Sequence, residues 1–228
     1  MRAYPASPLI AGALGQLLFR QHFDSAEAGQ LLALAAKTQP QNPESHHYYA
    51  QWAYLNSRER ICVQEEQSGL RAAGLNDLAL LQMNTLLGMC ASKMEDADAA
   101  RAAFHAAQEV NLRLAAFDPV AAYQFIQFES RYGDDSKVQA LVEQTLQRVP
   151  QFGPAHLERA KYFDRARNSE KAIEEAEVTL RSQGNDFNTE RAAHAILARS
   201  HKLLGHVEEA QQEQLWIERH PNPETRTN

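Results

Sequence analysis

The sequence predicts an all-α protein built from repeated pairs of helices. Ala, Leu, Gln, Glu and Arg dominate its 228 residues, whereas Val, Ile and Thr are sparse, and this mix favours helix over strand. A pattern of small and large apolar residues recurs along the chain at a nearly constant spacing. All nine prolines fall at the edges of the helices that this pattern defines.

The pattern is clearest between residues 87 and 107. It consists of Leu87, Gly88, Ala91, Ala100, Phe104 and Ala107, on two short helical segments with a break near Glu95 and Asp96. Two helices whose backbones approach closely need Gly or Ala at the contact and a bulky side chain one turn away. This stretch resembles the tetratricopeptide repeat (TPR), a helix–turn–helix unit of about 34 residues. The resemblance implies a right-handed superhelix of stacked helix pairs, an α-solenoid.

The same pattern places six TPR-like units along one predicted solenoid, from residue 9 to residue 222. The units lie near 9–42, 43–80, 81–118, 119–152, 153–190 and 191–222, with an N-terminal lead at 1–8 and a disordered tail at 223–228. The small position of the first helix holds Gln16, Ala50, Gly88, Ile126, Ala160 and Ala198. That of the second helix holds Ala28, Cys62, Ala100, Val138, Ala172 and Ala210. Self-similarity at this period is typical of a helical array and not of one compact core.

Local signals support the units in chain order. The first unit is the weakest, because Gly12, Gly15 and Gly29 lower its helix propensity. The second opens with an N-cap, Asn42, before Pro43. Gly133 and Gly205 stand where a left-handed residue would end the first helix of units four and six.

Side-chain stripes on individual helices mostly indicate packing or solubility. The aromatic residues of units two and four are Tyr48, Tyr49, Trp52, Tyr54, Tyr123, Phe125, Phe128 and Tyr132, and we interpret them as packing between helices. The last two units end in glutamate-rich helices, typical of a solvated outer wall.

Charge and the apolar segments narrow the classes of partner. The formal net charge of −6 argues against nonspecific nucleic-acid binding. The apolar run from Leu9 to Phe19 is too short to span a bilayer and lacks the flanks of a signal peptide, so we expect a first helix and no direct membrane insertion. Leu215, Trp216 and Ile217 near the end suggest an apolar patch on the last helix, which a second copy could cover in a homodimer around Trp216, or another part of a larger protein could cover.

The two cysteines, Cys62 and Cys90, form neither a CxxC motif nor a disulfide scaffold. Cys62 is expected to pack as a small hydrophobic residue. These thiols weakly favour a reducing compartment and a cytoplasmic location, or a periplasmic one if the chain is part of a longer membrane or exported protein.

The sequence offers little chemistry for an enzyme. None of the nine histidines forms an HExxH motif, and His46, His156 and His194 occupy the same position of three units, which indicates packing rather than one metal site. Nucleophile motifs and phosphate-binding glycine loops are lacking. We therefore expect no enzyme, no metal and no cofactor; a helical enzyme or metal-binding domain is the alternative.

The resemblance also implies a concave groove lined by the first helices, in which a peptide or helix of another protein binds. The groove positions include Gln51, Tyr54, Gln82, Tyr123, Gln127, Arg131, Lys161, Arg165, Arg199 and Lys202. The last five residues make the C-terminal half basic. They could hold an acidic partner, or they could be solvated or paired with neighbouring glutamates.

The resulting hypothesis is a non-catalytic protein-interaction scaffold that binds an acidic or mixed peptide. An assembly or targeting domain of a larger envelope or glycosyl-transfer protein is a further alternative. The carboxylate clamp known in the family is in doubt, because its Asn positions hold Gln51, Met89 and Gln127.

Overall fold

The computed structural model describes residues 7–221, and these residues form twelve α-helices and no strand. The helices are α1 (Pro8–Gln21), α2 (Ala26–Thr38), α3 (Pro43–Leu55), α4 (Glu59–Leu70), α5 (Asp77–Lys93), α6 (Ala97–Arg113), α7 (Pro119–Tyr132), α8 (Asp135–Arg148), α9 (Gly153–Arg165), α10 (Ser169–Arg181), α11 (Phe187–Leu204) and α12 (Val207–Arg219). The all-α prediction is confirmed. The predicted tail at 223–228 and most of the N-terminal lead lie outside the described residues.

The helix starts follow the predicted period closely. The first helices of the units begin at Pro8, Pro43, Asp77, Pro119, Gly153 and Phe187. Three of these starts coincide with the prediction and the others precede it by one to four residues. Each described proline lies in a first helical turn or outside the helices, as predicted, because proline lacks the N–H that a helix interior needs.

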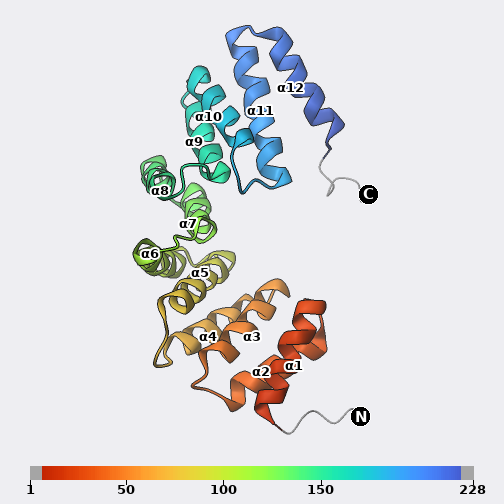
Figure 1. Cartoon of the computed structure of the whole chain (residues 1–228), viewed down its shortest axis with the longest axis vertical. Helices are drawn as coiled ribbons and strands as arrows, with labels where there is room; N and C mark the ends of the chain where they lie inside the picture. Colours follow the sequence, from red (N-terminus) through yellow and green to blue (C-terminus); the bar gives the residue numbers. More distant parts are fainter. Residues whose placement is uncertain (1–6, 222–228) are drawn as a thin grey trace. The chain divides into compact units, whose positions relative to one another are not determined.

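The chain divides into two compact units, one up to Phe128 and one from Glu129, which are called the first and the second unit from here on. The shorter TPR-like repeats are called helix pairs. Within the first, α1 packs on α2, α3 on α4, and α5 on α6; within the second, α9 packs on α10, and α11 on α12 (Figure 1). Neighbouring pairs also pack on each other, since α4 contacts α5 and α10 contacts α11. Each unit is therefore a stack of helix pairs, the arrangement of a TPR-like solenoid.

Asn and Asp side chains begin most of the helices. Their carboxylate or amide oxygens accept hydrogen bonds from backbone N–H groups of the first turn, which would otherwise lack partners. The residues that do this are Asn42, Asn76, Asp96, Asp134, Asn168 and Asp186.

In several helix pairs, the turn between the two helices has a left-handed residue at the same repeat position. Gly205 is left-handed there, with φ of 81°, as predicted. Its equivalents Ser57, Glu95 and Arg167 adopt φ of 54°, 61° and 56° although they carry side chains. The prediction for Gly133 is wrong, because its φ is not positive. A Cβ atom there would lie 2.8 Å from the backbone carbonyl oxygen of Glu129, which cannot move as a side chain can, so a larger residue would require the backbone to shift.

We expect Arg167→Gly to stabilise the protein. A left-handed conformation costs a non-glycine residue about 1–2 kcal/mol, and the entropic cost of glycine offsets only part of this. Arg167 is exposed, so its side chain adds little packing. The free energy of unfolding, measured by urea denaturation, should rise by about 0.5–1 kcal/mol. Gly205→Ala should lower it by a similar amount, and a loss of stability in Arg167→Gly would contradict this account of the turn.

The core forms where small and large residues meet, as the repeat pattern predicts. The position of a Cβ on Gly88 would lie 2.9 Å from the Phe104 ring, so α5 and α6 approach closely there. Phe104 is buried against Phe125 and Phe128, with ring centroids 5.6 and 5.4 Å apart. Trp52 is likewise buried, and its indole N–H donates to the Ser25 carbonyl. The interpretation as packing residues is confirmed for Trp52, Phe125 and Phe128.

The expectation that the two cysteines are free thiols is wrong. Cys62 on α4 and Cys90 on α5 are joined by a disulfide, with Cα atoms 6.2 Å apart. Both are fully buried, and Cys62 does fill the small space that the pattern predicts for its position. The sequence alone did not predict this bond, because the two cysteines belong to different helix pairs and become neighbours only when α4 packs on α5.

Candidate functional site

A hollow of about 310 Å³ is lined entirely by residues of the first unit. It opens on α3, α5 and the start of α7, the first helices of three successive helix pairs. Its lining consists of His47 and Gln51 from α3; Leu81, Gln82, Thr85, Leu86 and Met89 from α5; and Asp118, Val120, Ala121 and Gln124 from the start of α7. The structure thus brings together two of the predicted groove residues, Gln51 and Gln82. This surface is shared by α3, α5 and α7, the first helices of their pairs, on which the family resemblance led us to expect a groove.

A hydrogen-bonded chain fixes the polar wall on α3. The Nδ1 atom of His47 lies 2.6 Å from Oε1 of Glu66 on α4, and its Nε2 lies 3.0 Å from the Gln51 amide nitrogen. With the proton on Nδ1, the imidazole donates to Glu66 and accepts from Gln51. This chain of hydrogen bonds does not use the other amide N–H or the carbonyl oxygen of Gln51.

Glu66 supports this chain from inside the protein. Its side chain is fully buried, and burial raises its pKa above the ordinary value, while the hydrogen bond from His47 acts in the opposite direction. Oε2 of Glu66 has no hydrogen-bond partner within the described residues 7–221. Loss of its one hydrogen-bond partner among these residues would leave the buried Glu66 carboxyl group without any, which is costly in free energy. The position of Glu66 is therefore coupled to that of His47.

The opposite edge of the hollow is formed by the N-terminus of α7. Asp118 precedes this helix, and its carboxylate accepts hydrogen bonds from the backbone N–H groups of Val120 and Ala121. Two hydrogen bonds of 2.7 Å join the buried Asn111 side chain on α6 to the Asp118 backbone. The hollow is therefore rich in amide and apolar groups, with one carboxylate and no Lys or Arg in its lining.

The other predicted groove residues of the first unit lie outside this lining. Tyr54, near the end of α3, is partly buried against the core, and the Lys93 ammonium lies 3.9 Å from its ring centroid. Burial raises the pKa of the Tyr54 hydroxyl. Tyr123 and Gln127 lie on α7, and Gln127 is exposed.

The predicted basic residues lie in the second unit, and acids accompany most of them. Lys161 pairs with Glu158 at 2.7 Å, Arg165 with Asp135, and Arg199 with Asp164. Arg131 lies over the Tyr132 ring, 5.1 Å from its centroid. Glu158 and Asp135 are acids that the sequence analysis did not count, so this surface has less net positive charge than the sequence suggested.

The three histidines that share a repeat position share a partner position too. His46, His156 and His194 each place Nδ1 against the glutamate nineteen residues later, namely Glu65, Glu175 and Glu213. His46 and His156 also contact the carbonyl oxygens of Pro40 and Pro150 through Nε2. Each histidine–glutamate contact joins the two helices of one helix pair. Among residues 7–221, three side chains suited to a metal ion do not come together.

The pair in α9 and α10 should make stability depend on pH. Burial alone would lower the pKa of His156, but hydrogen bonds to Glu175 and Pro150 raise it above 6.5. Burial alone would raise the pKa of Glu175, but His156 and Arg159 lower it below 4.5. The contribution of His156 is present at low pH and lost as pH rises through its raised pKa. That of Glu175 is present at high pH and lost as pH falls through its lowered pKa.

Both contributions are present between pH 4.5 and 6.5, so the pair stabilises the fold most in that window. We expect His156→Gln to remove stability there, by about 1–3 kcal/mol, and to change it less above pH 8. Urea denaturation across this pH range measures the effect. His22→Gln, at an exposed position, is the control. Parallel curves for the His156→Gln variant and the unchanged protein would contradict the assignment.

One signal in the sequence was missed, and two residues of the hollow had none. The spacing of nineteen residues between histidine and glutamate recurs in four pairs, with His47 and Glu66 as the fourth, and it could have identified the residue that supports His47. Asp118 and Gln124 could not be assigned to the hollow from sequence, since their positions depend on how α7 packs.

The fold and the stacked helix pairs define the class: this is a TPR-like helical repeat protein. Three solved structures share the fold. The chain is similar to PilF of Pseudomonas aeruginosa, with a TM-score of 0.72 and 15% identity over 93% of this chain and 90% of that one. It is also similar to YrrB, described as a TPR protein with an unusual peptide-binding site (TM-score 0.61, 17% identity, covering 83% of this chain and 91% of that one).

The third is TTC0263, a thermophilic TPR protein of Thermus thermophilus (TM-score 0.58, 15% identity, covering 84% of this chain and 99% of that one). No family model and no curated protein matches the sequence. Identities this low establish the fold, and function has to be argued from the site. Among the described helices, none is long and apolar enough to cross a membrane.

Proposed function

We propose that this protein is a non-catalytic interaction module whose hollow on α3, α5 and α7 binds an extended peptide segment of another protein. The observation that supports this most is that first helices of three successive pairs line one concave surface. Hollows in which apolar walls surround a few fixed polar groups are typical of binding sites. The peptide-binding site named for YrrB, a protein of the same fold, agrees with this proposal.

The lining suits the main chain of a peptide. The amides of Gln51, Gln82 and Gln124 can each donate and accept, as a peptide bond does. Val120, which is exposed, and Met89 provide apolar surface for alternate side chains, and Met adapts to differently shaped groups. The proposed ligand is an extended segment with apolar or uncharged polar side chains.

A contribution of the basic residues in the second unit remains part of the proposal, but a smaller one than the sequence suggested. Ion pairs to Glu158, Asp135 and Asp164 compete with an acidic ligand for Lys161, Arg165 and Arg199. Replacing exposed pairs of this kind changes binding free energies by about 0–1 kcal/mol. We therefore propose that acidic residues in the ligand assist binding without determining it.

Selection from a phage-displayed library of random peptides tests the proposal, because it needs no knowledge of the natural partner. We expect selected peptides to lose about 10-fold or more in affinity for the double variant Gln51→Ala, Gln82→Ala, since two hydrogen bonds are removed. Gln64→Ala, on the exposed side of α4, is the matched control. Failure to enrich any peptide, or equal affinity for both variants, would contradict the proposal.

We also propose that the protein works in an oxidising compartment. The support is the buried disulfide between Cys62 and Cys90, because such bonds persist mainly outside the reducing cytosol. This favours the periplasmic alternative over the cytoplasmic expectation. Thiol titration of denatured protein from cells lysed with a thiol-blocking reagent should find both cysteines protected, and two free thiols would contradict it.

A further inference from the structure

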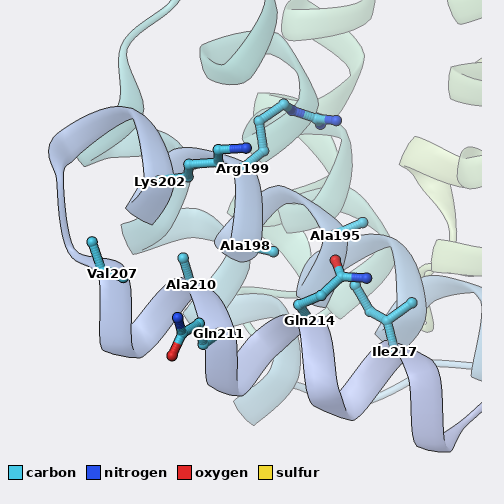
Figure 2. A pocket seen from close by; sticks show the side chains of 9 residues that line it. All are labelled: Ala195, Ala198, Arg199, Lys202, Val207, Ala210, Gln211, Gln214 and Ile217. Carbon is cyan, nitrogen blue, oxygen red and sulfur yellow. The ribbon is translucent and has the colours of Figure 1, made fainter.

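The C-terminal helix pair leaves a second, larger hollow open. It measures about 730 Å³ and lies between α11 and α12 (Figure 2). One wall consists of Ala195, Ala198, Arg199 and Lys202 from α11, and the other of Val207, Ala210, Gln211, Gln214 and Ile217 from α12. No residue of α12 is buried, in contrast to every other helix whose buried residues are described.

The preceding helix pair shows what covers this surface elsewhere in the fold. Thirty-eight residues earlier, Leu157, Ala160, Ala172 and Ala176 occupy the positions of Ala195, Ala198, Ala210 and Gln214. All four are buried, in a cluster with Ala193, Ile196 and Leu197 of α11. The open hollow is therefore the surface on which a further helix would pack.

The centre of the open surface is self-complementary. Gln211 and Gln214 stand where the preceding pair has Ile173 and Ala176. An amide both donates and accepts, so glutamines from two copies can satisfy each other across a two-fold axis. Apolar residues flank them on both sides: Val207, which is 61% exposed, precedes them and Ile217 follows.

The two helices that form the hollow differ in charge. The α11 wall carries Arg199 and Lys202. The α12 wall itself is uncharged, but α12 carries Glu208, Glu209 and Glu218 outside the lining of the hollow. Arg199 already pairs with Asp164, but Lys202 has no ion-pair partner within residues 7–221. An acidic helix of the α12 type therefore suits the hollow better than a basic one.

We propose that a second copy of this chain fills the hollow, with the two α12 helices antiparallel about a two-fold axis. In this arrangement Gln211 and Gln214 meet their counterparts near the axis, and Val207 packs on Ile217 of the other copy. Lys202 then lies beside Glu218 of the other copy, because an antiparallel α12 runs parallel to α11. The result is a four-helix interface, independent of peptide binding in the first unit.

Trp216 lies outside this interface. Its ring stacks on His194 and His220 of its own copy, at centroid distances of 3.7 and 4.3 Å. His194 in turn contacts Glu213. Trp216 is thus used within the pair of α11 and α12, and the proposed contact differs from the homodimer around Trp216 that the sequence suggested.

Sedimentation equilibrium of the whole chain, from about 1 to 300 µM, tests the proposal, because small polar interfaces dissociate in the micromolar range. We expect a monomer–dimer equilibrium. Ala210→Glu should abolish the dimer, whereas Leu215→Glu, at an exposed position outside the hollow, should leave it unchanged.

Charge reversal provides a test that does not depend on the folding of the Ala210→Glu variant. Lys202→Glu and Glu218→Lys should each weaken the dimer about 10-fold, since each change occurs twice per dimer, and the double variant should restore it. A monomer at all concentrations would overturn the proposal. Growth beyond a dimer, or failure of the double variant to restore the dimer, would overturn the antiparallel arrangement.

Discussion

Replacing Phe104 by alanine should lower the free energy of unfolding by about 3–5 kcal/mol. Phe104 is among the largest fully buried side chains of the described residues. It packs against Phe125 and Phe128 on α7 and against the backbone of α5 at Gly88. Removing the ring leaves a cavity that the rigid glycine contact cannot close, so the lost contacts are not recovered.

Urea denaturation followed by far-UV circular dichroism measures this loss. Phe23→Ala is the matched control, because Phe23 is 58% exposed and the same atoms are removed. We expect the control to change the free energy of unfolding by less than about 1 kcal/mol. Similar losses in both variants would contradict the assignment of Phe104 as the residue that joins α5, α6 and α7.

Reduction of the disulfide should have a comparable effect. Cys62 and Cys90 are 28 residues apart in sequence, and closing a loop of this length stabilises a folded chain by about 3–4 kcal/mol in the chain-entropy account. The bond also holds α4 against α5, the junction between the second and third helix pairs. We expect the first unit to lose most of this stability when the protein is reduced.

Denaturation with and without a phosphine reductant measures the difference. The double variant Cys62→Ala, Cys90→Ala should show low stability under both conditions and no response to the reductant, which separates the bond from other effects of reduction. Equal stability of the oxidised and reduced protein would contradict the proposed contribution.

Local signals in the sequence predicted most of the fold. Prolines such as Pro43 and Pro119 define helix starts through a property of the residue itself, and the small residues Ala100 and Gly88 define close contacts in the same way. These features depend on a few neighbouring residues, so one sequence is enough to read them. The disulfide depended instead on the packing of separate helix pairs, which the repeat pattern does not specify.

The candidate site was predictable only in part. Gln51 and Gln82 project from first helices at fixed repeat positions, and the structure places both in the hollow. The electrostatics were harder to predict. The sequence left open whether Lys161 and Arg165 bind a partner or pair with neighbouring acids. Their pairing acids, Glu158 and Asp135, were identified only from the packed helices. The net charge of a surface depends on which acidic and basic side chains lie close together, and composition alone does not give this.

Backbone amide chemical shifts test the central claim most directly, that the inner wall of first helices performs the binding. Titration of the labelled protein with the tightest peptide selected from the random library should shift amides around Gln51, Gln82 and Gln124. Residues on the second helices, such as Gln64 and His105, should stay unchanged. Shifts confined to the second helices or to the hollow between α11 and α12 would contradict the account.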